Sequence, residues 1–312
     1  MSIIERIQEY SKYDIQRIGL SATIANPTEI LFWISGSSKR GNSVITPNKS
    51  RNKSKIFIRY FDDFNLNSID FLVRELKDRK TLFFSNSRTN AEKVATLLKE
   101  KGLNARVHHS SISKNLRAIS EDKLKKSSEE IVLCCTSTME LGIDVGELDI
   151  VMQLGCPSTV ASFRQRMGRT GRRESTISHY QFCVENKVDL VKSIAIVELA
   201  SKKWIESIDI SSSSYTTLFQ QIIFLIQQKF GAKENDIIRL VKSSKCFENI
   251  DDIKLDNFIK YLIENKYIEN SNGEYLLGCT TEKDYGYNLI MNFISVFESL
   301  PEYTVIYIKI NI

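Results

Sequence analysis

The chain has 312 residues, enough for two or more domains, and its hydrophobic content of 42% supports ordinary packed cores. A formal net charge of +5 makes it mildly basic, which is compatible with a nucleic-acid partner without proving one. The sequence has no apolar run long enough to span a membrane, no apolar centre of a signal peptide, and no Cys-x-x-Cys pair among its six cysteines. We therefore expect a cytoplasmic protein with free thiols, no membrane association and no metal site of its own.

The first 45 residues are expected to begin with an amphipathic helix over 1–10, with its isoleucines gathered on one face. A short buried strand is predicted over 15–20. It leads into the small-hydroxyl turn 21–23 and then into a helix beginning near Pro27, because proline suits the first turn of a helix. The stretch 35–55 is rich in Gly, Ser, Asn and Lys, which predicts a linker or an exposed hairpin.

Short apolar runs alternate with helical patterns from residue 55 to about residue 185. The runs lack strict alternation, which is typical of strands covered on both faces. Alternating units of this kind form a parallel sheet with helices on both faces, joined by right-handed crossovers. The predicted strands are 55–60, 81–84, 105–108, 131–135, 150–154 and 178–183. The predicted helices are 90–101, with a capping box of Thr89 and Glu92, 113–126 and 160–167.

Polar loops follow several of these strands. The carboxyl ends of parallel strands meet at one edge of a sheet, where ligand sites gather, so we expect the loops to lie together. Hydroxyl, amide and guanidinium groups at such an edge suit phosphate oxygens, although any one loop alone would be an ordinary turn. The loops are Ser85-Asn86-Ser87-Arg88, His109-Ser110-Ser111, Thr136-Ser137-Thr138 and, one helix after residue 154, the arginine- and glycine-rich run 165–173.

A different pattern follows the last predicted strand. A long helical pattern over 186–203 and a serine turn over 211–214 lead to three helices and a hairpin signal, which together predict a winged helix. The helices are 218–230, 234–242 and 254–265, and the hairpin strands are 266–269 and 274–277. In a DNA reader the third helix would enter the major groove, but its outer face here is not basic. We therefore favour a structural or strand-guiding role over the reading of sequence.

Four segments, in this order, resemble motifs III, IV, V and VI of superfamily-two helicases. Their amino-acid sequences are most similar to those of the Lhr (large helicase-related) group of DEAD/DEAH-box proteins. The segments are Ser21-Ala22-Thr23, residues 81–88, Thr136-Ser137-Thr138-Met139-Glu140-Leu141-Gly142-Ile143-Asp144 and Gln165-Arg166-Met167-Gly168-Arg169-Thr170-Gly171-Arg172. Residues 108–113 and 155–158 are similar to two further stretches of that group. The resemblance covers most of the chain.

The resemblance implies a RecA-like α/β fold, a parallel sheet with helices on both faces, followed by an α+β winged-helix domain. It divides the chain into four parts. Residues 1–45 are the tail of a first RecA-like lobe, with motif III and a linker, and residues 46–195 are the second, C-terminal helicase lobe. Residues 196–278 are a connecting helix and the winged helix, and residues 279–312 are the start of a further domain.

In this family ATP lies between the two lobes, and the second lobe supplies arginine fingers, which by position are Arg169 and Arg172. Their task is to stabilise charge on the transferring phosphoryl group. The match implies four further cofactor-binding positions, Gly142, Asp144, Gln165 and Arg166. Two of these have alternatives: Asp144 as a plain helix or turn cap, and Arg166 as a residue that holds the loop by pairing with a carboxylate.

The match also implies residues that hold the nucleic-acid backbone, a contact that gives grip without reading sequence. They are Ser85, Asn86, Ser87, Arg88, His109, Ser110, Thr136 and Ser137. The alternative for His109 is a packed or capping histidine. The family has glycine where Ser110 or Ser111 stands here, so an added side chain narrows the expected path of the strand.

One departure from the family is large. The sequence contains no Gly-x-x-x-x-Gly-Lys-Ser/Thr phosphate loop and no Asp-Glu box before Ser21, so the phosphate cradle, its lysine and the magnesium carboxylate are missing. ATP and Mg²⁺ would then be held mainly by a first RecA-like lobe, present in cis or in trans. We expect this chain alone not to hydrolyse ATP.

The expected function is the C-terminal portion of an ATP-dependent helicase that couples ATP hydrolysis to translocation on single-stranded nucleic acid and to duplex unwinding. The expected partners are single-stranded DNA or RNA, or a DNA–RNA hybrid; the resemblance favours DNA or the hybrid, three-prime to five-prime movement and a role in DNA repair. Two alternatives stay open, a non-enzymatic nucleic-acid-binding module and an inactive gene fragment. Both ends of the chain look cut, as in a gene fragment, a split protein or a deliberately shortened chain.

Overall fold

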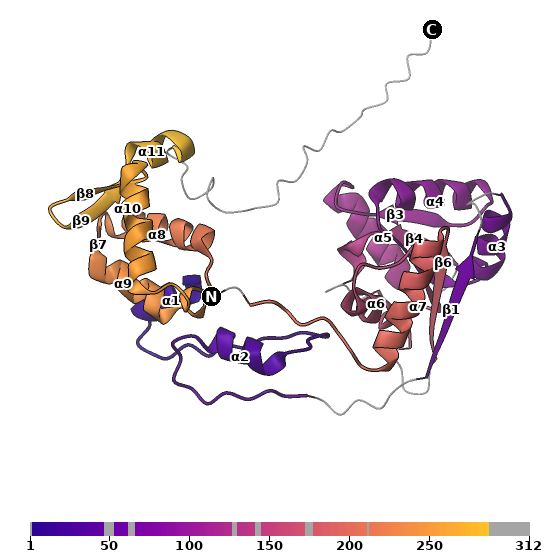
Figure 1. The fold of residues 1–312 in the computed structure, drawn as a ribbon. Coiled ribbons are helices and arrows are strands. Elements are labelled where there is room, and N and C mark those ends of the chain that lie inside the picture. Colours follow the sequence, from indigo (N-terminus) through magenta and orange to yellow (C-terminus); the bar gives the residue numbers. More distant parts are fainter. Residues whose placement is uncertain are drawn as a thin grey trace, which may run out of the picture. The chain divides into compact units, whose positions relative to one another are not determined.

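The computed structural model describes residues 2–46, 53–61, 66–126, 130–140, 145–171, 177–210 and 212–286. They form two compact units, each with its own hydrophobic core (Figure 1). The sheet unit consists of the described residues of 22–25 and 53–206. The helical unit consists of 2–21, 26–46 and the described residues of 207–286.

The sheet unit is built on a six-stranded parallel sheet with the order β1-β6-β5-β2-β4-β3. The strands are β1 (Ser54–Tyr60), β2 (Lys80–Ser85), β3 (Ala105–His108), β4 (Ile131–Cys135), β5 (Ile150–Leu154) and β6 (Ser178–Val184). All six predicted strands are present, and their bounds differ from the predicted ones by one residue at most. The four strands β2, β4, β5 and β6 are almost wholly buried, as continuous apolar runs predict.

Helices cover both faces of this sheet. They are α3 (Leu66–Leu76), α4 (Arg88–Glu100), α5 (Lys114–Lys126), α6 (Val160–Met167) and α7 (Lys187–Ser201), with a short 3₁₀ turn η1 (Ser137–Met139) after β4. One core cluster holds α3 and α4 against the sheet, and a second cluster on the opposite face contains residues of α5, α6 and α7. The predicted RecA-like architecture is therefore confirmed.

Two sequence predictions about these helices need correction. Ser87, rather than Thr89, caps α4, because its hydroxyl accepts the Asn90 backbone N–H at 3.1 Å, while Glu92 turns away to His109. The predicted boundary at residue 195 falls inside α7, which packs on α6, β1 and β6 and so belongs with the sheet.

The helical unit combines helices with a small antiparallel sheet. The helices are α1 (Ser2–Tyr10), α2 (Pro27–Ser35), α8 (Tyr215–Lys229), α9 (Glu234–Ser243), α10 (Asp252–Glu264) and α11 (Cys279–Tyr285), with a 3₁₀ turn η2 (Lys245–Phe247). The strands are β7 (Ala232–Lys233), β8 (Ile268–Ser271) and β9 (Glu274–Leu277), in the order β7-β9-β8. The three helices and the hairpin expected after residue 214 are thus present. Their core is formed by residues of α8, α9 and α10 together with η2, β7, β8 and β9.

The N-terminal residues differ from their prediction. No strand forms over 15–20, and Ile18 and Leu20 are 80% and 98% exposed. A strand needs a hydrogen-bonded neighbour, and none of the described strands lies beside this segment. In α1 Ile3 and Ile7 are exposed, while Glu5 is buried and pairs with Arg17 at 2.6 Å.

Some expectations fall on residues outside the described ranges, including most of the segment 279–312. Within the ranges described, no helix is both long enough and apolar enough to pass through a membrane. The six cysteines are free thiols, five of them buried. Burial raises the pKa of the Cys183 thiol to about 12, so this group is uncharged near neutral pH.

Candidate functional site

The strand register brings the predicted loops to one edge of the sheet. Ser85 at the end of β2 lies level with Leu154 of β5, and Cys135 of β4 lies level with His108 of β3. Phe84 pairs with Cys135 on the other side of β2, so these four strands end together. The loops that follow them therefore start from one carboxyl edge, as the sequence predicted.

A buried polar network crosses this edge from α6 to β2. The Arg166 guanidinium forms an ion pair with Glu140, where its Nε donates at 2.9 Å, and it also donates to the Gln153 carboxamide oxygen. Gln153 donates in turn to Asn86 at 3.3 Å and to the Leu154 carbonyl at 2.7 Å. The network ties α6 to the ends of β4, β5 and β2.

The burial of Arg166 bears on the two roles predicted for it. The residue is 4% exposed, and its guanidinium lies 4.8 Å from the centroid of the Phe84 ring. A charge removed from water in this way needs a partner, and Glu140 supplies it. The carboxylate pairing that was the alternative for Arg166 is therefore present, and its contact with a nucleotide stays a prediction.

Arg169 lies in the turn that ends α6. Its backbone N–H donates to the Arg166 carbonyl at 3.0 Å, and its guanidinium donates to the Glu140 carbonyl, just after η1. The side chain is largely buried against this loop. The guanidinium thus lies at the carboxyl edge, beside the loop that follows β4.

Gln165 connects the α6 segment to the N-terminal motif. Its Nε2 donates to the Thr23 hydroxyl at 2.7 Å, within the same unit. Residues 22–25 cluster with the sheet unit, whereas the segments on either side of them cluster with the helical unit. Gln165 therefore positions Thr23 and the turn after α6 relative to each other.

The start of α6 is held by a carboxylate from the end of the sheet unit. Glu206 accepts the backbone N–H groups of Val160 at 2.7 Å and Ala161 at 3.1 Å, and Thr159 accepts that of Ser162 at 3.0 Å. These bonds satisfy N–H groups that a helix start leaves without intrahelical partners, and a negative charge there is favoured by the helix dipole. The helix that carries the arginines is thus fixed at its first turn.

Some of the residues predicted to hold a nucleic-acid backbone are exposed to solvent, and others are buried. Those on the surface or partly exposed are Asn86, Ser87, Arg88, Ser110, Thr136 and Ser137. Ser85 is 1% exposed and its hydroxyl has no hydrogen-bond partner within the described residues, so it lies beneath this surface. Arg88 is exposed, and its guanidinium reaches the Ser111 hydroxyl at 2.5 Å, linking the loops after β2 and β3.

The two adjacent histidines are structural in this arrangement. His108 Nε2 contacts Glu121 at 2.7 Å and its Nδ1 contacts Thr138 at 2.9 Å, while His109 Nε2 contacts Glu92 at 2.9 Å. Both rings are buried and hold α5 and α4 to the end of β3. The predicted phosphate contact of His109 therefore has only its Nδ1 to offer, an atom without a partner in the described part of the chain.

Three of the predicted nucleotide-side residues, Gly142, Asp144 and Arg172, lie outside the described residues. Of the remaining groups, the Arg169 guanidinium has the charge and the edge position to meet a phosphate. No three His, Cys, Asp or Glu side chains of the described residues come together as a metal site, so we assign none of them to Mg²⁺.

Three residues that build the site were not among the predicted site residues. They are Glu140, Gln153 and Glu206. For Gln153 a signal was present, because it is the one polar residue in the otherwise apolar strand β5. A buried carboxamide of this kind needs hydrogen bonds, which here come from the edge network. The part played by Glu206 depends on a contact 45 and 46 positions away in sequence, which no local pattern reveals.

The comparisons with known proteins agree with this geometry. Residues 65–174 match the family described as Helicase conserved C-terminal domain. The chain is 30% identical over 281 residues to ATP-dependent helicase Lhr-Core protein 2 of Thermococcus barophilus, a match that covers 84% of this chain and 32% of that protein. The Lhr helicase/uracil glycosylase of Escherichia coli is 29% identical over 276 residues, which cover 70% of this chain and 18% of that protein.

A solved structure of Mycobacterium smegmatis helicase Lhr, bound to single-stranded DNA and AMP-PNP, is also similar. The TM-score is 0.76 at 25% sequence identity, and the match covers 89% of this chain and 39% of that one. The chain spans about a third, or less, of the length of the curated relatives described here. With the helicase C-terminal match, the Lhr relatives and the sheet edge in agreement, the chain belongs to the Lhr-type helicases of superfamily two.

Proposed function

We propose that this chain acts as the second RecA-like lobe of an ATP-dependent helicase, which couples ATP hydrolysis to movement along a single strand and to duplex unwinding. The observation that carries the proposal is the convergence on one sheet edge of the arginine-bearing turn after α6 and the hydroxyl-bearing loops after β2, β3 and β4. Phosphate groups are common to both substrates, ATP and nucleic acid, and this edge offers guanidinium, amide and hydroxyl donors.

In this proposal Arg169 is an arginine finger, and Arg172 is the second. The Arg169 guanidinium rests on the Glu140 carbonyl, a neutral acceptor. A phosphoryl oxygen is an anionic acceptor, so a nucleotide presented by a first lobe would attract this guanidinium. The buried pair of Arg166 and Glu140 keeps the loop in place while Arg169 changes partner.

The proposed strand contacts are the exposed donors of the same edge, above all Arg88, Ser87, Ser110 and Ser137. Their contacts would go to phosphates and sugars, which fix the register of a strand without reading its bases. The Mycobacterium smegmatis relative holds single-stranded DNA, so we propose single-stranded DNA as the track. Binding to phosphates should weaken steeply with rising salt.

We also propose that α8, α9, α10 and the sheet β7-β9-β8 are a winged helix with a structural or strand-guiding role. The outer face of α10 supports this, because it is exposed and of mixed charge rather than basic. The exposed residues are Asp256, Asn257, Lys260 and Glu264. A helix that entered the major groove would need to meet closely spaced phosphates with positive charge.

Residues 1–45 are proposed to be the tail of the first lobe and its linker. In the structure this segment packs on the proposed winged helix. Arg6 of α1 donates to the Gln221 side chain at 3.3 Å and to the Phe224 carbonyl at 3.4 Å, and Lys245 lies 4.2 Å above the ring of Phe32. Trp33 packs against the core of the same unit. These contacts support a mechanical connection from the first lobe to the winged helix.

The test is ATP hydrolysis by the full chain mixed with the first lobe of an Lhr-Core relative, in the presence of single-stranded DNA. We expect turnover from the mixture and none from this chain alone. Arg169→Ala should lower the rate about 10³-fold or more, since arginine fingers contribute about 10³–10⁵ in rate. The matched control is Arg164→Ala on the same helix. Turnover by this chain alone, or a mixture unaffected by Arg169→Ala, would contradict the proposal.

A further inference from the structure

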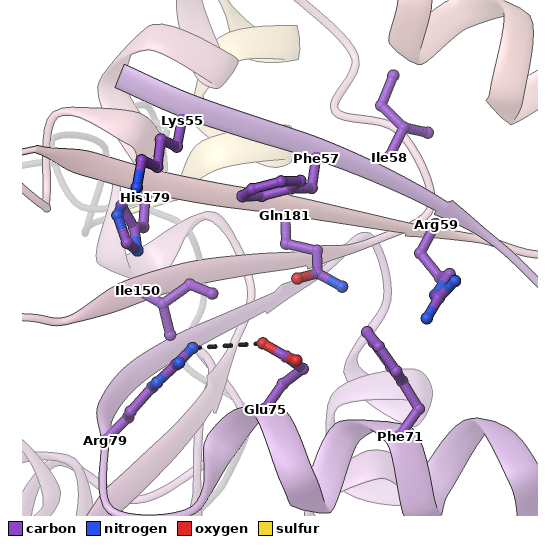
Figure 2. A pocket seen from close by; sticks show the side chains of 10 residues that line it. All are labelled: Lys55, Phe57, Ile58, Arg59, Phe71, Glu75, Arg79, Ile150, His179 and Gln181. Carbon is purple, nitrogen blue, oxygen red and sulfur yellow. Dashed lines mark hydrogen bonds and ion pairs between the residues drawn. The ribbon is translucent and has the colours of Figure 1, made fainter. Parts of the chain in front are cut away.

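A cavity of about 460 Å³ lies at the other end of the sheet unit, between β1 and α3 (Figure 2). Its lining includes Lys55, Ile150 and His179, which stand at or near the amino ends of β1, β5 and β6, and Arg79, which precedes β2. The loops of the proposed phosphate-binding site, in contrast, follow the carboxyl ends of the strands. The cavity is therefore a second site, separate from that edge.

Positive charge dominates the cavity wall. Lys55, Arg59 and Arg79 line it, and Glu75, which pairs with Arg79 at 3.3 Å, is the only carboxylate among the described residues of the lining. The Arg59 guanidinium lies 4.4 Å from the centroid of the Phe71 ring, and neither Lys55 nor Arg59 has an ion-pair partner among the described residues. Within the described part of the chain, both cations are therefore available to an anionic ligand.

A nearly buried carboxamide points into the same space. Gln181 on β6 is 5% exposed, and Figure 2 shows its amide group directed into the cavity between Phe57 and Glu75. Its amide atoms are not among the fully buried polar atoms that lack a partner, so they reach the open space of the cavity. A carboxamide that faces an open cavity offers both a donor and an acceptor to a ligand bound there.

The cavity also has an apolar part and an open strand beside it. Phe57 is 55% exposed, and together with Phe71 and Ile150 it offers rings and a methyl group to a ligand. β1 is the edge strand of the sheet, and no other strand in the described part of the chain pairs with its outer side. Such an edge can accept an added extended strand, with alternate side chains of the newcomer entering neighbouring pockets.

We propose that this cavity is a docking site for an extended acidic peptide of a partner protein, which adds alongside β1. One of its carboxylates would meet Lys55 and the Gln181 amide, and an apolar side chain would cover Phe57. The charge of the lining and the open strand edge both support a peptide. The positive charge of the lining would also suit a nucleic acid, but the open strand edge would not.

His179 makes the docking dependent on pH. Burial first, and then the positive charges of Lys55 and Arg79, lower the pKa of its imidazole, while Asp149 raises it. Glu75 of α3 also faces the cavity. His179 is therefore neutral at neutral pH in the free protein. A bound carboxylate offsets the field of the two cations and raises this pKa, so binding takes up a proton and tightens as the pH falls.

The test uses the full chain and a set of fluorescein-labelled nine-residue peptides that alternate aspartate with phenylalanine, valine or leucine. Binding is followed by fluorescence anisotropy. The variants are Lys55→Glu, Gln181→Leu and His179→Gln, and Lys187→Glu on α7 is the control with the same change in net charge. Two competitors are compared, the same peptides with asparagine for aspartate and a single-stranded oligothymidylate.

We expect at least one acidic peptide to bind, with an affinity about tenfold lower in Lys55→Glu and in Gln181→Leu and unchanged in Lys187→Glu. The gain in affinity between pH 8 and pH 6 should disappear in His179→Gln. Failure of every peptide to bind, equal binding by the asparagine peptides, or equal effects of Lys55→Glu and Lys187→Glu would overturn the proposal. Full displacement by the oligothymidylate would do so as well, in favour of nucleic acid.

Discussion

The Arg166 side chain is the residue on which the candidate site depends most. Its guanidinium satisfies Glu140 and Gln153 at once, both in the interior. Removing one member of a buried ion pair leaves the other charge without compensation, which is strongly destabilising. Arg166 therefore stabilises the fold of the sheet unit at this edge.

Arg166→Met should lower the free energy of unfolding by about 3–5 kcal/mol, because it leaves the Glu140 carboxylate buried and alone. The matched control is Arg164→Met on the same helix, with an expected change of about 0.5 kcal/mol or less. Urea denaturation of both variants measures the difference. Adding Glu140→Gln to Arg166→Met should recover part of the loss. Equal effects of the two arginine substitutions would show that the pair contributes nothing.

At the scale of residues, the sequence predicted which side chains gather at the edge better than it predicted which of them are buried. The motif spacing and the parallel sheet place Asn86, Arg88 and Ser137 at the edge, because strand ends meet there whatever the side chains do. It could not show that Ser85 and His109 are buried. Depth depends on neighbours such as Glu92, which are set by the packing of α4 rather than by local sequence.

At the scale of elements, the strands of the sheet unit were predictable because a strand buried on both faces needs an apolar run, whatever lies around it. The helix α1 was predictable in place but not in orientation. Its amphipathic pattern suggested that the isoleucines face the core, yet the buried residues are Ser2 and Glu5. Packing on α9 and the contacts with α8 decide the orientation, and both partners lie more than 200 residues away.

The end of α8 offers a test of backbone conformation. Phe230 caps this helix with φ 56° and ψ 31°, a left-handed conformation that favours glycine, and its side chain is 91% exposed. Phe230→Gly should stabilise the chain by about 0.5–1 kcal/mol, because it relieves the Cβ strain and removes little packing. Phe230→Ala, which keeps a Cβ, should give no such gain. Thermal unfolding of both variants checks this, and a less stable glycine variant would refute it.

The start of α9 offers a test of charge. Asp236 accepts the Lys229 ammonium at 2.6 Å and the Lys233 backbone N–H at 3.1 Å. The hydrogen bond with Lys229 contributes most to lowering the pKa of this carboxyl. Its stabilisation is therefore complete above the unfolded pKa of about 4 and is lost as the pH falls through the lower folded pKa.

Asp236→Asn should cost about 1 kcal/mol at pH 7, and the difference from the parent chain should shrink as the solution is acidified below pH 4. The control is Asp252→Asn in α10, whose carboxyl lies 3.7 Å from Lys242 in an exposed pair and should contribute little. Melting temperatures measured from pH 7 to pH 3 report both. A difference that stayed constant over this range would contradict the assigned charge effect.

At the scale of the whole molecule, the fold of each unit followed from sequence, whereas the strand expected over 15–20 did not form. A buried strand over 15–20 was expected from its apolar residues, but a strand forms only where another strand completes its hydrogen bonds. Ile18 and Leu20 are exposed instead. This exposed apolar segment fits the proposed dependence on a first lobe, since that lobe would cover it.

Leu20→Asp should therefore leave the folding of the isolated chain unchanged, because a side chain that is 98% exposed contributes no packing. It should weaken the association with a first lobe at least tenfold, because a charge would be buried there. Titration calorimetry with the first lobe of an Lhr-Core relative measures the association, and Lys12→Asp is the control. Unchanged association would rule out this segment as part of the contact.

The central claim is that the loops after β2, β3 and β4 and the turn after α6 form one phosphate-binding edge. The most direct measurement is the change in amide chemical shifts of the full, ¹⁵N-labelled chain when oligothymidylate is added at low salt. We predict that shifts concentrate at Asn86–Arg88, Ser110, Thr136–Ser137 and Arg169, and that they vanish at high salt. Shifts confined to the helical unit or to the cavity beside β1, with none at these loops, would contradict the account.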